Sequence, residues 1–229
     1  MPTTRTALIT GATRGIGQEL TKQASLKGIR VFATGRDADL LANLQAETGC
    51  LGKVCDLTDP EAVVRLYATA RQALGKIDIL VNNAGGNSRK SPLVESTLEE
   101  FDAHYALNLR APYILCREAM KEMAPRQSGQ IINVISSCAL FSNENMGAYT
   151  TMKAGLRGLT GVLIKEARRN HIKVTAVYPG GVNTEFRTQA RPDYMSPASV
   201  ATMIMNVILA PADVVMHDLT FRPWVEDNF

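Results

Sequence analysis

The sequence predicts an α/β fold with a doubly wound, seven-stranded parallel sheet and helices on both faces. Short, almost continuously apolar runs alternate with longer amphipathic stretches along the whole chain. Continuous rather than alternating apolar runs are typical of strands that helices cover on both faces, and strand–helix alternation favours a parallel sheet. The chain contains no internal repeat, low-complexity tract or linker-like segment. We therefore expect residues 1–229 to form one domain.

The apolar and amphipathic stretches place each expected element. Strands are expected at residues 6–10, 30–34, 51–55, 77–81, 130–135, 172–177 and 214–221. Helices are expected at residues 15–27, 39–47, 60–74, 98–123, 149–170 and 197–209. Two polar segments, residues 85–97 and 184–196, interrupt this alternation. Both follow predicted strands, at the sheet edge where open α/β folds bind ligands, so we expect them to contact substrate.

The composition is that of an ordinary globular protein, with 45% hydrophobic and 21% charged residues. A formal net charge of +3 does not indicate a nucleic-acid partner. The longest mostly apolar run, residues 200–210, is shorter than the roughly 20 residues that span a bilayer, so no membrane partner is expected. The first residues show no signal-peptide pattern, and we expect a cytoplasmic location.

The cysteines and histidines do not follow the spacing of metal ligands. The chain has 4 cysteines and 3 histidines, without a C-x-x-C or H-E-x-x-H motif. We expect Cys50, Cys55, Cys116 and Cys138 to be buried free thiols, and we expect no metal site.

A glycine-rich turn, T-G-A-T-R-G-I-G at residues 10–17, follows the first predicted strand and opens the first predicted helix. Glycines let the backbone turn tightly and approach a phosphate, and the helix start offers unpaired N–H groups to that anion. An ordinary strand–helix turn is the alternative explanation. As a dinucleotide site, the turn would use Gly11, Thr13, Arg14, Gly15, Ile16 and Gly17.

Four motifs in a fixed order resemble the single-domain branch of the short-chain dehydrogenase/reductase family. They are T-G-x-x-x-G-x-G, N-N-A-G at residues 82–85, Y-x-x-x-K at residues 149–153 and P-G at residues 179–180. The resemblance covers essentially the whole chain. It implies a Rossmann-like fold, a nicotinamide cofactor and the interconversion of a small-molecule carbonyl and alcohol. It also implies a homodimer or homotetramer and, through the similar 3-oxoacyl-carrier-protein reductases, 3-oxoacyl thioesters as one substrate class.

Two arginines favour NADP(H) over NAD. The residue about 20 positions after the glycine turn contacts the adenosine ribose, and a count from Gly17 reaches Asp37, an acid that indicates NAD. The family, however, places its acid at the tip of the second strand, where this chain has Gly35. Arg14 and Arg36 offer the guanidinium geometry that suits a 2′-phosphate. Asp37 is then better explained as a helix N-cap.

The resemblance assigns further cofactor contacts to the ends of later strands. Asp56 matches the family's adenine contact, with capping of the next helix as an alternative or additional role, and Leu57 follows it. The other expected contacts are Asn83, Ala84, Gly85, Tyr149, Lys153, Pro179, Gly180, Val182 and Thr184.

Tyr149 and Lys153 form the expected catalytic pair, because residues four apart share one helix face. A phenol has a pKa of about 10, and a nearby ammonium lowers it toward the working range. The resemblance implies that Tyr149 protonates the carbonyl oxygen as hydride arrives. It further implies that Ser137 hydrogen-bonds that oxygen, Lys153 binds the nicotinamide ribose, and Asn108 holds a water of the proton relay.

The serine is less firmly placed than the tyrosine. The family's serine usually lies one residue further from the tyrosine than Ser137 does, which selects Ser136. It is also usually the second serine of I-S-S, which favours Ser137, and a one-residue deletion within residues 140–147 would reconcile the spacing. Adjacent strand residues point to opposite faces, so only one of them serves.

Other function classes remain open. A sugar-nucleotide epimerase would need a larger C-terminal domain than the residues after Thr184 provide. An NADPH-binding regulatory or scaffold protein without turnover is the main alternative, although such proteins often lose the tyrosine or lysine. Residues 216–223 lack the glycine-rich ending of 3-oxoacyl reductases, which leaves other carbonyl substrates open. Arg126 and Arg169 lie near the carrier-protein docking positions of those reductases, with solvated surface arginines as the alternative.

Overall fold

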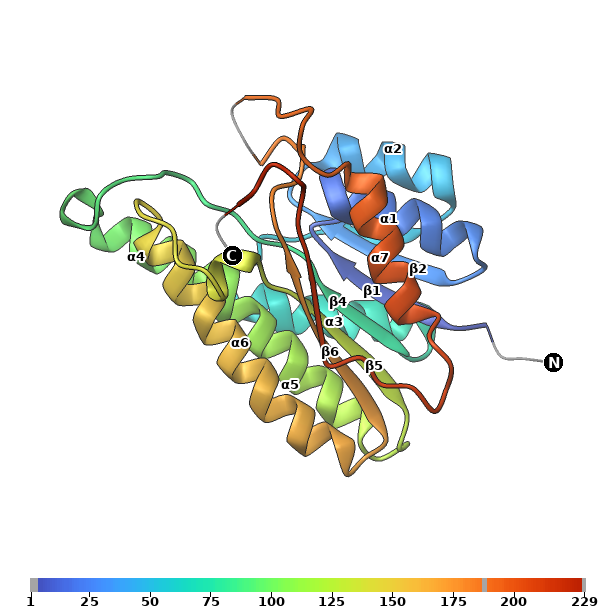
Figure 1. Ribbon diagram of the computed structural model, residues 1–229. Coiled ribbons are helices and arrows are strands. Elements are labelled where there is room, and N and C mark those ends of the chain that lie inside the picture. The colour runs from blue at the N-terminus through green and yellow to red at the C-terminus, as the bar shows by residue number, and fades with distance from the viewer. Residues whose placement is uncertain (1–3, 187–188, 228–229) are drawn as a thin grey trace.

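A computed structural model describes residues 4–186 and 189–227. Its seven strands form one parallel sheet in the order β3-β2-β1-β4-β5-β6-β7, which confirms the predicted Rossmann-like, doubly wound architecture (Figure 1). The strands are β1 Thr6–Thr10, β2 Arg30–Gly35, β3 Leu51–Val54, β4 Ile79–Asn82, β5 Gly129–Val134, β6 Ile172–Pro179 and β7 Asp218–Phe221. The strand order reverses direction between β1 and β4, and ligands bind at such switch points.

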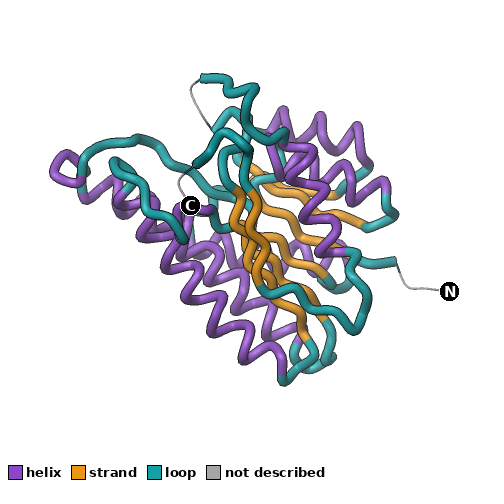
Figure 2. The backbone as a smooth tube through the Cα atoms, in the orientation of Figure 1, coloured by secondary structure: helices purple, strands orange, loops and turns teal. Residues whose placement is uncertain are grey.

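Helices cover both faces of the sheet, as Figures 1 and 2 show. The helices are α1 Gly15–Leu26, α2 Ala38–Thr48, α3 Pro60–Leu74, α4 Leu98–Tyr105, α5 Ala111–Met123, α6 Gly147–Arg168 and α7 Pro197–Ile208. The first, second and seventh helices share one hydrophobic cluster with the sheet, and the third, fifth and sixth share the other.

Burial on both faces explains the continuous apolar runs of the strands. All five residues of β1 are buried. Ala7 and Ile9 pack into the cluster on one face, whereas Leu8, between them, packs into the cluster on the other. Side chains alternate between faces along a strand, so two helical layers require apolar residues at successive positions.

Side-chain caps fix several helix starts. The carboxylate of Asp37 accepts a hydrogen bond from Leu40 N at 3.1 Å, which confirms the predicted N-cap of α2. Asp59 caps α3 just before a proline at its first position. Thr97 and Glu100 form a capping box at the start of α4.

The single helix expected at residues 98–123 is interrupted in the structure. Between α4 and α5 lies a π-helical turn, η2 Ala106–Arg110. Pro112 follows it and lacks the N–H that would continue the α-helical ladder. Such turns occur often at functional sites, and this one carries Asn108.

The strand expected at residues 214–221 is shorter in the structure, because its first half bonds to side chains. Lys173 Nζ donates to the carbonyl of Val214 at 2.6 Å, and Thr175 Oγ1 donates to that of Met216 at 2.6 Å. The strand expected from residue 77 begins later because Ile77 N donates to the carboxylate of Glu122 at 3.0 Å. The other element bounds differ from expectation by at most two residues. No helix among the described residues has the length and apolarity to cross a membrane.

Candidate active site

Three adjoining cavities lie where the strands end at their carboxyl edge. The cavity beside the glycine turn, called the glycine-turn cleft, has a volume of about 660 Å³. The tyrosine pocket, of about 140 Å³, contains Tyr149 and Lys153. The polar cleft, of about 710 Å³, lies beside the loops that carry Asn87 and Ser137. Phe186 lines all three cavities, and its ring centroid lies 6.0 Å from that of Tyr149.

The glycine turn has the backbone shape that its sequence predicts. Gly11 and Gly15 adopt φ values of +62° and +53°, a region that other residues rarely occupy. A Cβ on Gly17 would lie 2.1 Å from the carbonyl oxygen of Gly11, so that glycine serves close packing. Asn83 Nδ2 braces the turn by donating to the carbonyl of Thr10 at 3.0 Å and that of Gly11 at 3.1 Å.

Most of the predicted glycine-turn residues line the glycine-turn cleft. Those that line it are Gly11, Thr13, Arg14, Gly15 and Ile16, together with Asn83, Ala84 and Gly85 after β4 and Thr184 after β6. Gly17 lies outside the lining, consistent with its packing role.

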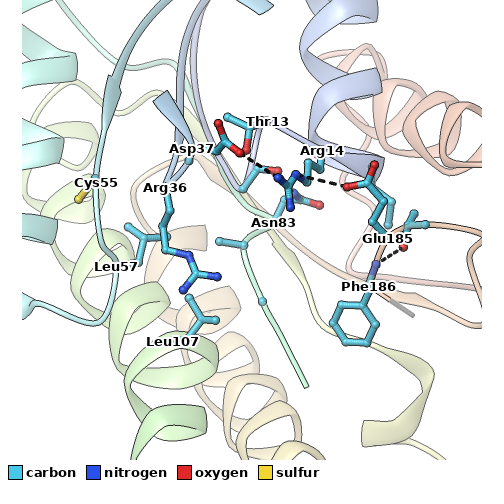
Figure 3. A pocket seen from close by; sticks show the side chains of 17 residues that line it. Thr13, Arg14, Arg36, Asp37, Cys55, Leu57, Asn83, Leu107, Glu185 and Phe186 are labelled. Carbon is cyan, nitrogen blue, oxygen red and sulfur yellow. Dashed lines mark hydrogen bonds and ion pairs between the residues drawn. The ribbon is translucent and has the colours of Figure 1, made fainter. Parts of the chain in front are cut away.

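Two guanidinium groups reach the cleft beside β2 (Figure 3). Arg14 pairs with Asp37 at 2.8 Å and with Glu185 at 3.3 Å. Arg36 extends into the cleft, and within the described part of the chain it makes no ion pair or hydrogen bond. A Cβ on Gly35 would lie 2.5 Å from the side chain of Thr13. Close packing of β2 against the glycine turn therefore requires a residue without a side chain at this position.

Asp56 does not line the cleft. Its carboxylate accepts hydrogen bonds from Thr58 N at 2.9 Å and Thr58 Oγ1 at 2.8 Å, and these bonds lower the pKa of Asp56. Cys55 and Leu57 line the cleft instead. Leu57 was expected there, whereas no motif predicted Cys55. The next helix is capped by Asp59 rather than Asp56.

Tyr149 and Lys153 lie side by side on α6 and are both buried. Lys153 Nζ donates to the carbonyl of Val134 at 3.1 Å and lies 5.7 Å from the centroid of the Tyr149 ring. Removal from water lowers the pKa of Lys153 to about 8. The remaining predicted residues of this pocket are present: Asn83, Gly85, Pro179, Gly180, Val182 and Thr184.

Asn108 fixes the backbone beside this pair. Its side chain is fully buried, and Oδ1 accepts from Gly86 N at 3.1 Å. Nδ2 donates to the carbonyls of Gly86 at 3.0 Å and His104 at 3.2 Å. A Cβ on Gly85 would lie 2.9 Å from Asn108 Oδ1 and 3.1 Å from Lys153 Nζ. The asparagine, the lysine and the N-N-A-G segment are therefore in direct contact range.

The structure separates the two candidate serines. Ser136 lines both the tyrosine pocket and the polar cleft, and its Oγ accepts from Cys138 N at 3.2 Å. Ser137 begins the short helix η3 Ser137–Ala139. It lines the polar cleft but not the tyrosine pocket. Ser136 thus shares a wall with Tyr149, whereas the predicted Ser137 lies in the adjoining cavity.

His104 was not predicted. It is buried on α4, its ring meets that of Tyr149 edge-on at 6.2 Å, and burial lowers its pKa. Its Nδ1 lies 3.5 Å from Asn108 Nδ2. A signal was available, because His104 precedes Asn108 by four positions and so shares its helix face.

Two other expectations concern the cysteines and Arg126. All four cysteines are buried. Arg126 is largely buried and pairs with Asp78 at 3.5 Å and Glu122 at 3.6 Å, so it is not a free docking cation. The described residues contain no cluster of three or more potential metal ligands.

A parallel sheet with a glycine-lined cleft at its switch point, and a buried Tyr–Lys pair at that edge, defines a Rossmann-like enzyme architecture. A family model for short chain dehydrogenase matches residues 5–195, and the chain belongs to this family of oxidoreductases.

Individual proteins support the same assignment. The chain is 34% identical over 194 residues to a short-chain type dehydrogenase/reductase of Picea abies, covering 79% of this chain and 72% of that protein. A metagenomic short-chain oxidoreductase in complex with NADP has a TM-score of 0.86 and 30% identity, covering 97% of this chain and 98% of the other. The closed form of serine dehydrogenase complexed with NADP+ has a TM-score of 0.89 and 25% identity, covering 96% of each chain.

Proposed function

We propose that the protein is an NADP(H)-dependent oxidoreductase that reduces a small-molecule carbonyl to an alcohol, or catalyses the reverse reaction. The single observation that carries this proposal is the pairing of Tyr149 with buried Lys153 beside the glycine-turn cleft. An NADPH-binding regulatory protein would not need this pair, and that alternative is not favoured. The reaction is tested by NADPH oxidation with carbonyl substrates, using Tyr149→Phe as the control.

The cleft fits a dinucleotide in size and in chemistry. Its volume of about 660 Å³ lies in the usual range of ligand sites, roughly 300–1,000 Å³. The start of α1 suits a pyrophosphate, and two of the similar solved proteins hold NADP. The bound cofactor would supply or accept the hydride. Residues proposed to hold it are those of the glycine turn, Arg36, Leu57, Asn83 to Gly85, Tyr149, Lys153, Pro179, Gly180, Val182 and Thr184, with Asp56 retained as a prediction.

Arg36 and Arg14 would select the 2′-phosphate. Arg36 faces the cleft without an ion pair in the described part of the chain, so a phosphate would provide its partner. Arg14 already pairs with Asp37 and Glu185, and a phosphate would compete with those two carboxylates. We expect a fluorescence titration to show tighter binding of NADPH than of NADH. Equal affinities would contradict this preference.

Tyr149 would donate its phenolic proton to the carbonyl oxygen of the substrate. Lys153 supplies positive charge beside the ring, which favours the phenolate left after proton transfer. With its pKa lowered to about 8, Lys153 still carries this charge in most molecules at pH 7. Asn108 holds Gly86 and the chain next to Lys153, and we propose that it also serves the proton relay.

Ser137 is proposed to hydrogen-bond the substrate oxygen, with Ser136 as the alternative. The pair Ser137→Ala and Ser136→Ala tests this choice, and only the catalytic serine should lower kcat strongly. Full turnover in Ser137→Ala with loss in Ser136→Ala would reverse the assignment, in agreement with the position of Ser136 in the tyrosine pocket.

The finer predictions from the sequence are also testable. Acetoacetyl thioesters probe the 3-oxoacyl class, while the engagement of Arg126 by two carboxylates removes one argument for carrier-protein docking. A homodimer or homotetramer is proposed from the family resemblance and is tested by light scattering. The one-domain organisation and the cytoplasmic location stay predictions.

A further inference from the structure

Asn87 has a buried carboxamide that the rest of the site does not use. Neither its Oδ1 nor its Nδ2 has a hydrogen-bond partner among the described residues. Buried polar groups are nearly always paired, and leaving one unpaired is costly. Asn87 lines the polar cleft together with Ser136 and Ser137, and it lines a second, smaller cavity together with Tyr149. Asn87 therefore forms part of the wall of both cavities, together with the two serines in one and Tyr149 in the other.

The position of Asn87 is fixed by its neighbours. Gly86, the preceding residue, is held at both its N–H and its carbonyl by the buried side chain of Asn108. Further along, Ser91 N donates to the carbonyl of Asn145 at 3.0 Å. The backbone on both sides is anchored, so the unpaired amide belongs to a braced segment of the cavity wall.

Charged groups near Asn87 differ in their availability. Arg89 forms ion pairs with Glu95 at 3.2 Å and with Glu100 at 3.4 Å. Lys90 also lines the polar cleft and makes no ion pair within the described residues. The loop of Asn87 thus offers a carboxamide and one available ammonium.

Acidic residues occupy other parts of the same wall. Glu144, Glu226 and Asp227 line the polar cleft. Glu226 is engaged by Arg222 at 3.0 Å and by Gly181 N at 3.0 Å. These carboxylates repel each negative charge on a substrate, so they disfavour a substrate with several negative charges more strongly than one with a single charge.

We propose that Asn87 and Lys90 recognise the carboxylate of a small oxo acid, or of the corresponding hydroxy acid, that carries one negative charge. Nδ2 of Asn87 donates to a carboxylate oxygen, and the ammonium of Lys90 pairs with that carboxylate. The inference rests on the proposed carbonyl–alcohol reaction and names its substrate class. It places charge recognition on the loop of residues 86–97, next to the serines and Tyr149.

The test compares acetoacetate with methyl acetoacetate as substrates for NADPH oxidation, because the two share a ketone and differ in charge. The wild-type chain should show a kcat/KM at least about tenfold higher for the acid. A hydrogen bond to a charged group is worth about tenfold or more in affinity. Asn87→Leu, a nearly isosteric change, should therefore lower kcat/KM for the acid about tenfold, mainly through KM, and change the ester little.

Two further variants separate recognition from folding. Lys90→Met should raise KM for the acid, whereas Lys27→Met, a change at the exposed end of α1, should leave it unchanged. Asn87→Leu breaks no hydrogen bond among the described residues, so its thermal midpoint should not fall. A purely structural Asn87 would give the same kcat/KM change for both substrates.

The outcomes distinguish this inference from the proposed function. An ester that equals or exceeds the acid in the wild type, or equal losses for both in Asn87→Leu, overturns the inference. Turnover of other ketones without turnover of either acetoacetate compound also overturns it and leaves the proposed reaction intact. Absence of turnover with every carbonyl, while NADPH binds, refutes the proposed function itself.

Discussion

Replacing Lys153 by methionine should change how stability depends on pH. The side chain is almost completely buried, and its ammonium donates a hydrogen bond to the carbonyl of Val134 at 3.1 Å. Burial lowers the pKa of Lys153 from 10.5 to about 8. Lys153→Met keeps the apolar stem and removes the charge, so comparison of the two chains isolates the cost of burying that ammonium.

The lowered pKa fixes both the sign and the size of the effect. The charged form is disfavoured in the folded state, so its cost is complete below pH 8 and disappears as pH rises through 10.5. By linkage, this cost is about 3 kcal/mol at pH 7 and about 1 kcal/mol at pH 10. The wild type should therefore gain about 2 kcal/mol relative to Lys153→Met over this interval.

Urea unfolding of both chains at pH 7 and pH 10, without cofactor, measures the difference. Effects of the lost Val134 bond and of methionine packing do not depend on pH, so they cancel between the two conditions. A free-energy gap between the chains that is the same at both pH values would refute the argument. That result would mean that Lys153 keeps an ordinary pKa, either through solvent access or through an unseen charge partner.

Three further predictions follow from contacts of the site. Arg36→Ala should raise the Kd of NADPH about tenfold and that of NADH little, and equal effects in a titration would contradict a 2′-phosphate contact. Asn108→Leu should lower the free energy of unfolding by about 2 kcal/mol and reduce kcat, because both backbone groups of Gly86 lose their partner; unchanged urea midpoints would contradict this. Glu226→Gln should lower the thermal midpoint, because the buried guanidinium of Arg222 loses its ion-pair partner, and an unchanged midpoint would show that other contacts of Arg222 suffice.

Most of the fold could be predicted because the patterns that indicate it, such as apolar runs and glycine turns, extend over only a few consecutive residues. Ala7, Leu8 and Ile9 alternate between two hydrophobic clusters, so an uninterrupted apolar run records a strand covered on both faces. The glycine turn and the four-residue spacing of Tyr149 and Lys153 are likewise short-range patterns. They predict the position of the glycine-turn cleft and the shared pocket of Tyr149 and Lys153.

The features that sequence reasoning missed depend on long-range contacts. The π-helical turn around Asn108 accompanies hydrogen bonds to Gly86, 22 positions earlier. His104 gains its place from the ring of Tyr149, on another helix. Phe186 belongs to an irregular segment, and its place in the lining of all three cavities depends on tertiary contacts, such as that of its ring with Tyr149. No hydrophobic periodicity in the sequence predicts these long-range contacts.

The most direct test follows NADPH absorbance with a panel of carbonyl substrates, led by acetoacetyl thioesters, for the wild type and Tyr149→Phe. Loss of a positioned acid commonly lowers rates by roughly 10²–10⁴-fold. We expect the wild type to reduce at least one carbonyl, and we expect Tyr149→Phe to lose this turnover to that extent while still binding NADPH. NADPH binding without turnover in the wild type, or turnover that survives in Tyr149→Phe, would contradict the account.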